Sequence, residues 1–182
     1  MRGAAINVES FDDLPVPLWT IKDYSGNYFW TTNVSVPLAT IREIGGFNES
    51  FSEYGWEDID VGLRLRFRGT KAVFNPKALA YHWKPRPRSG GVENMLRQAR
   101  AQARTAVQLA RIHPHWRTYL ATGMNPVQRA YHATTRGLRA ADRLRKQVGD
   151  LSSDRALSDR ELRAARALAS EAYFEELELA LT

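Results

Sequence analysis

The chain has 182 residues, of which 43% are hydrophobic, and it contains five Trp and no Cys. This apolar content is enough for a folded core and excludes a chain that is disordered throughout. The lack of Cys excludes disulfide scaffolds, thiolate zinc sites and cysteine nucleophiles. No apolar run is long enough to span a bilayer, and polar residues interrupt the apolar N-terminal stretch, so we expect a cytoplasmic protein without an export signal.

The net charge of +6 is distributed unevenly along the chain. Residues 84–149 carry 14 basic and 2 acidic side chains, whereas residues 1–83 have a net charge of −2 and residues 150–182 of −4. The basic character therefore belongs to the middle of the chain and not to the fold as a whole.

The first elements follow from local patterns. Residues 1–25 are weakly patterned and predict an irregular lead-in. Aromatic and β-branched residues over 27–36 favour a strand. Apolar residues at helical spacing then predict a short helix that Ser35 caps and that Gly45 and Gly46 end.

The next segment alternates between loop, helix and strand signals. Four aromatic residues interrupted by Gly, Asn, Glu and Ser predict a loop over 47–56. Apolar positions four residues apart predict a helix over 57–68. Short β-favouring runs predict strands over 71–75 and 79–83.

The second half of the chain is predicted to be helical. Residues 84–91 are rich in Pro and Gly and predict a linker. Beyond it, apolar residues at helical spacing predict three helices, over 92–113, 126–148 and 158–181.

These elements predict an α/β protein with a small partial sheet and short helices, followed by an all-helical C-terminal extension. The expected domains are the lead-in, a domain over 26–83, the linker, and a helical extension over 92–182. That extension divides into a basic part, 92–149, and an acidic part, 150–182.

The most concentrated chemistry lies where the predicted loop meets the helix after it. Glu57, Asp58 and Asp60 cluster at the helix N-terminus, where the helix dipole favours ionised carboxylates. An ionised carboxylate can accept a proton from a sugar hydroxyl while an aromatic ring, Tyr54 or Trp56, stacks on the sugar. Acidic residues in a first turn are also ordinary helix caps, so both interpretations stay open.

A wider set of motifs occurs in a specific order: Asn33-Val34-Ser35, Gly45-Gly46-Phe47-Asn48-Glu49, Gly55-Trp56-Glu57-Asp58, a helical Arg64 and a strand ending near His82. Over residues 26–83 this order resembles the C-terminal half of family-two glycosyltransferases of GT-A fold. The most similar segment is the galactosyltransferase C-terminal domain. The resemblance implies a partial GT-A-type sheet and transfer of a sugar from a nucleotide-sugar donor to a glycan or lipid-linked acceptor.

The resemblance also implies roles for single residues. Asp58 matches the base that deprotonates the acceptor hydroxyl in an inverting displacement, and Glu57 matches a residue that holds acceptor hydroxyls. Further acceptor-side positions are Tyr54, Trp56, Gly46, Phe47 and Asp60.

Two more positions match the family pattern. His82 matches a ligand of the catalytic Mn²⁺ or Mg²⁺, and imidazole suits Mn²⁺ better than Mg²⁺. A lone His at a strand end is also commonly an ordinary surface residue. Arg64 matches a recurrent helical Arg to which we assign a structural role in a pair with a nearby carboxylate.

The donor-binding part of such enzymes has no counterpart in this sequence. In the family, nucleotide-binding strands and an Asp-x-Asp motif lie many tens of residues before the Asn-x-Ser motif, whereas 32 residues precede Asn33 here. Asp12-Asp13 lacks the spacing and the flanking apolar strand. We therefore expect an acceptor-side half. Its donor half would come from missing coding sequence or a partner chain, or its catalytic role would be lost.

The basic block allows three interpretations. Its Arg stripes suit a solvated face balanced by the acidic C-terminal helix, a peripheral contact of 92–149 with the anionic inner face of a membrane, or nucleic acid. Nucleic acid is the least favoured, because aromatic residues are sparse and no nucleic-acid motif occurs. The alternative to an enzyme is a non-catalytic module that binds glycan or membrane through these helices.

Overall fold

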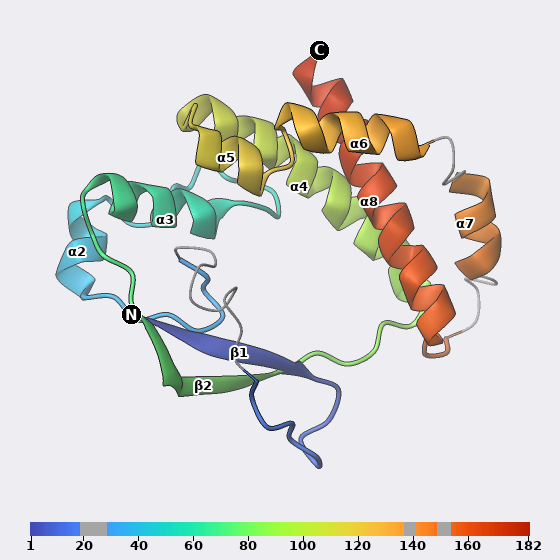
Figure 1. Cartoon of the computed structure of the whole chain (residues 1–182), viewed down its shortest axis with the longest axis horizontal. Helices are drawn as coiled ribbons and strands as arrows, with labels where there is room; N and C mark the ends of the chain where they lie inside the picture. The colour runs from blue at the N-terminus through green and yellow to red at the C-terminus, as the bar shows by residue number, and fades with distance from the viewer. Residues whose placement is uncertain (19–28, 137–140, 149–153) are drawn as a thin grey trace. The chain divides into compact units, whose positions relative to one another are not determined.

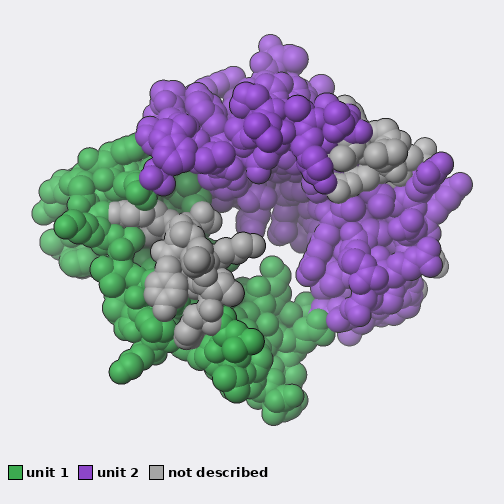
Figure 2. Space-filling model, in the orientation of Figure 1, with its two compact units in different colours: residues 1–50, 57–85 green, residues 51–56, 86–182 purple. Residues whose placement is uncertain are grey.

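The computed structural model describes residues 1–18, 29–136, 141–148 and 154–182. It contains a two-stranded parallel sheet together with several helices, which confirms the predicted α/β class with a partial sheet and a helical extension (Figure 1). The chain forms two compact units, shown in Figure 2. The first unit comprises Met1–Ser50 and Glu57–Pro85, and the second comprises Phe51–Trp56 and Arg86–Thr182.

The sheet of the first unit consists of β1 (Arg2–Val8) and β2 (Phe74–Trp83). β1 lies within the predicted lead-in, so the prediction of irregular structure is wrong for these residues. Gly and Ala give β1 a weak strand propensity, but the ladder to β2 and the burial of Ala4 and Val8 outweigh it. The Asn33 side chain donates to the carbonyls of Ala4 at 2.7 Å and Ala78 at 2.9 Å, which ties both strands to the following loop.

β2 is one strand where two were predicted, over 71–75 and 79–83. The pairing register shifts between Arg2 and Ala4, whose partners are Phe74 and Leu79. Pro76 falls in the skipped part of β2, and a proline has no N–H to donate to a ladder. The proline therefore interrupts the pairing without ending the strand.

The strand predicted over 27–36 is wrong where it can be checked. Residues 27 and 28 lie outside the described residues, and 29–36 form turns and one isolated bridge between Arg2 and Val34. Phe29 is buried against Val61 and Leu65. The aromatic and apolar residues that suggested a strand therefore contribute to the core of the first unit instead.

Two helices complete the first unit. The prediction of α2 (Leu38–Glu43) is confirmed, and Gly45 and Gly46 follow it with φ of 81° and 74°, in the left-handed region that favours glycine. The position before α2 is Pro37, without a side-chain cap, so Ser35 is not its cap. The helix predicted over 57–68 is confirmed as α3 (Glu57–Phe67).

The second unit is built from helices, and the prediction of an all-helical extension is confirmed for the described residues. Two long helices, α4 and α8, pack along one another, and α7 packs on α8 (Figure 1). The helix predicted over 126–148 is described as two, with residues 137–140 between them outside the described residues. The short α5 was not predicted. The elements are η1 (Ser89–Gly91), α4 (Val92–Ile112), α5 (Trp116–Ala121), α6 (Pro126–Arg136), α7 (Ala141–Val148) and α8 (Asp159–Leu181).

Residues 86–91 of the predicted linker are bound into the second unit, whereas 84 and 85 belong to the first. Pro87 accepts a hydrogen bond from the Leu157 N–H at 3.0 Å, and the Ser89 N–H donates to the Arg155 carbonyl at 2.9 Å. Ser89 is fully buried. This stretch is therefore part of the packed unit and not a free spacer. Ser158, which follows, forms a capping box with Glu161 at the start of α8.

Acidic side chains of α8 form ion pairs with several arginines of the basic segment 84–149. The ion pairs join Arg86 to Asp159 at 2.8 Å, Arg104 to Glu176 at 2.8 Å, and Arg129 to Glu178 at 2.8 Å. These pairs favour the interpretation of a solvated face balanced by the acidic helix. Contact of 92–149 with an anionic membrane stays a prediction. Among the described residues, no helix combines the length and the apolar character needed to cross a bilayer.

Candidate functional site

The acidic cluster occupies the first turn of α3. Glu57, Asp58 and Asp60 all lie there, as predicted. Burial of the Asp58 carboxyl, and secondarily the charge of Glu57, raise the pKa of Asp58 to about 6, while backbone N–H groups of Ile59 and Thr31 partly oppose this rise. A carboxylate that titrates near neutral pH has the proton affinity that a general base needs.

Glu57 stands out because part of its carboxylate is buried without a partner. Its Oε2 atom is inaccessible to solvent and has no hydrogen-bond partner among the described residues. A buried acceptor in this state costs free energy. A ligand hydroxyl that donates to it would remove this cost, as expected for a residue that holds acceptor hydroxyls.

Substitution of Asp58 with Asn is expected to raise the melting temperature at pH 7 to 8. The folded-state pKa of Asp58 lies above its usual value, so folding favours the protonated form and the stability contributed by this group falls as pH rises from about 4 to 6. Asn resembles the neutral form at every pH. The gain in melting temperature should therefore disappear below about pH 4. Thermal unfolding of both proteins at a series of pH values measures this difference. An equal gain at acid and neutral pH would contradict the raised pKa of Asp58 as its cause.

Asp60 differs from Glu57 and Asp58 in being fully buried. Its side chain is 0% exposed and accepts two hydrogen bonds from Arg64, at 2.6 and 2.9 Å. Arg64 also donates to the Ile44 carbonyl at 2.6 Å, which fixes the end of α2 against α3. The structural pairing predicted for Arg64 is confirmed. The acceptor contact predicted for Asp60 is disfavoured, because its carboxylate is enclosed and ion-paired.

The Gly-Gly-Phe turn is explained by the end of α2. The Gly46 N–H donates to the Ile41 carbonyl at 2.9 Å, closing the helix. Phe47 packs edge-on to Phe29 at 6.2 Å between ring centroids and remains 47% exposed. The acceptor-side roles of Gly46 and Phe47 stay predictions.

His82 lies on β2 beside β1. Its Nδ1 is 2.9 Å from Oδ1 of Asn7, the residue opposite it in the parallel register. Nowhere among the described residues do three His, Asp or Glu side chains come together as metal ligands would. His82 and its described neighbours therefore do not make a metal site by themselves, and the Mn²⁺ or Mg²⁺ stays a prediction.

Tyr54 and Trp56 belong to the second unit, where α4 holds the loop that carries them. The Trp56 indole N–H donates to the Gln102 carbonyl at 2.8 Å. The Thr105 hydroxyl donates to the Tyr54 carbonyl at 3.2 Å, and Arg104 pairs with Glu53 at 2.9 Å. These α4 residues could not be predicted from the sequence, because they lie about 50 positions from the loop and carry no motif.

Gly55 is required by this docking. A Cβ atom at position 55 would lie 1.9 Å from Thr105 Oγ1 and 2.7 Å from Thr105 Cβ. Substitution with Ala is therefore expected to displace the loop and lower the free energy of unfolding by about 1–3 kcal/mol. Gly90→Ala is the matched control, because nothing lies within 4 Å of a Cβ there. Urea unfolding measures both variants, and equal stabilities would refute the contact.

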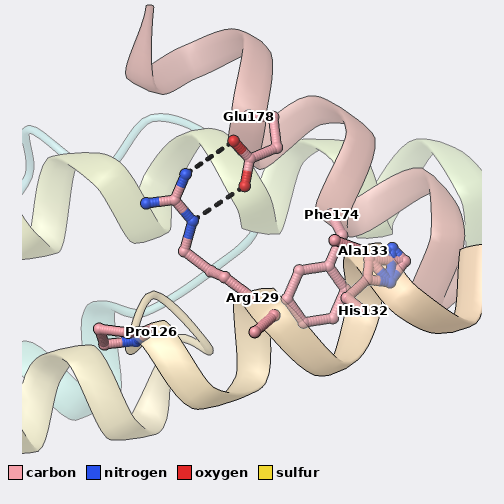
Figure 3. A pocket seen from close by; sticks show the side chains of 7 residues that line it. Pro126, Arg129, His132, Ala133, Phe174 and Glu178 are labelled. Carbon is pink, nitrogen blue, oxygen red and sulfur yellow. Dashed lines mark hydrogen bonds and ion pairs between the residues drawn. The ribbon is translucent and has the colours of Figure 1, made fainter.

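Cavities open among the described helices of the second unit. One, of about 550 Å³, is lined by residues of α6 and α8 (Figure 3). Figure 3 shows Arg129 joined to Glu178 by two hydrogen bonds, at 2.8 and 2.9 Å. His132 stacks on Phe174 at 4.2 Å between ring centroids, and its Nε2 lies 3.4 Å from Glu171 Oε2.

A smaller cavity, of about 280 Å³, includes Trp56 and is here called the Trp56 cavity. Its walls come from the docked loop, from α4, from the end of α5 with the turn after it, and from α6 and α8. The lining residues are Trp56, Gln102, Ala121, Thr122, Gly123, Gln128, Tyr173 and Phe174. Of these, Trp56 is the residue predicted from the sequence as a ligand contact.

Comparison with known proteins supports a relation to glycosyltransferases over part of the chain. Residues 18–84 match a family model described as the N-terminal domain of galactosyltransferase, whereas the resemblance above was to a C-terminal segment. Two curated relatives are validoxylamine A glucosyltransferases of Streptomyces hygroscopicus subsp. jinggangensis (strain 5008) and subsp. limoneus. Each is 39% identical over 66 residues, which cover 32% of this chain and 16% or 15% of the relative.

The matched region is thus about a sixth of the length of these relatives. No solved structure shows significant similarity to the chain. The match includes α2, α3, β2 and the loop before α3, and so includes every residue of the acidic cluster. Residues 18–84 are therefore a glycosyltransferase-like segment.

Proposed function

We propose that this chain takes part in transfer of a sugar from a nucleotide-sugar donor to an acceptor hydroxyl. The observation that carries the proposal is Asp58, a carboxyl with a pKa of about 6 in the first turn of α3. Beside it in the chain is Glu57, whose Oε2 is buried with no hydrogen-bond partner among the described residues. This pair lies within the segment that is similar to glycosyltransferases.

In the proposed reaction, ionised Asp58 accepts the proton of the acceptor hydroxyl. The acceptor oxygen forms a bond to the anomeric carbon of the donor as the bond to the nucleoside diphosphate breaks, and the diphosphate leaves with the electron pair. A base that forms no covalent intermediate gives a single displacement, and hence inversion at the anomeric carbon. Glu57 accepts a hydrogen bond from an acceptor hydroxyl and orients the ring.

We assign the described site to the acceptor side. A nucleoside diphosphate is held by cations or by backbone N–H groups, whereas the α3 N-terminus presents carboxylates. In this proposal the donor is held by residues other than the carboxylates of the α3 N-terminus. Mn²⁺ or Mg²⁺ would act on the donor diphosphate, and none of the steps above depends on it.

The activity named for the two relatives, glucosyl transfer to validoxylamine A, indicates which substrates to test first. The chain is incubated with UDP-glucose or UDP-galactose, with Mn²⁺ or Mg²⁺, and with validoxylamine A or simple glucosides as acceptors. Mass spectrometry then looks for an acceptor that has gained one hexose. A product that requires both substrates supports transfer, and a folded chain that forms none under any of these conditions contradicts catalysis by this chain alone.

A further inference from the structure

We propose that the Trp56 cavity of the second unit binds one uncharged polyhydroxylated ring, a sugar or a cyclitol. Three features of the cavity support the proposal: its aromatic and amide side chains, the hydrogen bonds that hold its aromatic rings in place, and its lack of charged residues. It rests on the proposed function only in assigning the bound ring to the acceptor.

The walls combine the two kinds of group that such a ring needs. Trp56, Tyr173 and Phe174 provide aromatic surface for the C–H face of a ring. The side-chain amides of Gln102 and Gln128 offer both donors and acceptors, which suits hydroxyl groups that also donate and accept.

The aromatic walls are held in place before any ligand arrives. The Trp56 indole N–H is bonded to the Gln102 carbonyl, and the Tyr173 hydroxyl donates to the Thr122 carbonyl at 2.7 Å. Phe174 packs edge-on to Tyr173, with ring centroids 5.3 Å apart and an interplanar angle of 84°. Because the walls are already ordered, binding loses little side-chain entropy.

Charge separates this ligand from a nucleotide sugar. None of the eight described residues that line the cavity is charged, so nothing there would neutralise a diphosphate. The volume of about 280 Å³ lies just below the range of about 300–1,000 Å³ usual for small-molecule pockets and suits a single ring.

The test is direct binding by the full chain, followed by NMR of its Trp indole N–H groups. Methyl α-D-glucopyranoside and myo-inositol are titrated separately, with UDP as the charged comparison. The Trp56 resonance is assigned by its loss in Trp56→Phe. We expect at least one of the two neutral rings, and not UDP, to shift this resonance in a saturable way.

A second variant makes the test independent of any effect of Trp56→Phe on folding. Gln128 is exposed at the rim, and its replacement by Ala should weaken binding about fivefold through loss of a hydrogen bond. Gln98→Ala, an exposed glutamine of α4 outside the cavity, should leave binding unchanged.

Three results would overturn the proposal: neither neutral ring binds, a ring binds without shifting the Trp56 resonance, or Gln128→Ala and Gln98→Ala behave alike. The proposed transfer reaction fails by a different measurement, the absence of a glycosylated product. Binding at the Trp56 cavity can therefore be established or refuted whether or not transfer occurs.

Discussion

Replacement of Asp58 by Asn is expected to lower the rate of glycosyl transfer by about 10²–10⁴-fold. Asn keeps the size of Asp and can still accept hydrogen bonds from the backbone N–H groups of Ile59 and Thr31, but it cannot take a proton from an acceptor hydroxyl. The measurement is the initial rate with the donor and acceptor that give product with the unmodified chain. Asp13→Asn, at an exposed position away from the cluster, is the matched control and should retain full activity.

The pH dependence gives an independent check on the same residue. The base must be ionised, and the pKa of Asp58 is about 6, so the rate should rise through pH 6 and level off above it. Glu57 is adjacent and raises this pKa by its charge. Glu57→Gln should therefore shift the rise to lower pH. An unchanged rate in Asp58→Asn would refute Asp58 as the base. So would a pH profile of Glu57→Gln that is identical to that of the unmodified chain.

Replacement of Arg64 by Met should cost about 3–5 kcal/mol in the free energy of unfolding. Met preserves much of the side-chain volume but removes the ion pair with the carboxylate of Asp60, which is 0% exposed. It also removes the hydrogen bond from Arg64 to the Ile44 carbonyl. Urea denaturation followed by far-ultraviolet circular dichroism measures the loss.

The chain offers a matched pair for comparison. Arg68 is paired with Glu43, but both side chains are about half exposed, so Arg68→Met should cost less than about 1 kcal/mol. The double variant Asp60→Leu with Arg64→Met should recover much of the stability, because it removes the buried charge together with its partner. Equal losses in Arg64→Met and Arg68→Met would contradict a role for burial.

Helices with strong local signals could be predicted from the sequence. α4 has a long apolar stripe, α8 begins at a Ser158 capping box, and α2 ends at two glycines, so neighbouring residues determine each of them. β1 could not be predicted, because its Gly-Ala-Ala sequence becomes a strand only through pairing with β2, some 70 residues later. The strand predicted from the aromatic residues near Phe29 is wrong because these residues favour a strand locally, whereas packing against α3 determines their conformation.

The same division holds for the candidate site. The acidic cluster could be predicted, since its three carboxylates are neighbours in the chain, and so could a carboxylate partner for Arg64 four residues away. The burial of Asp60 and the raised pKa of Asp58 depend on residues packed around α3. The walls of the Trp56 cavity come from four helices and two loops, so no local pattern reveals them.

The boundary of sequence similarity and the boundary of folding do not coincide in this chain. Similarity to glycosyltransferases ends at residue 84, yet residues 51–56, which lie inside the matched region, pack on α4, which lies outside it. A polypeptide cut at residue 84 would keep Trp56 and lose the carbonyl of Gln102 that its indole N–H donates to. Dissection of this protein for recombinant expression should therefore keep α4 attached to the matched segment.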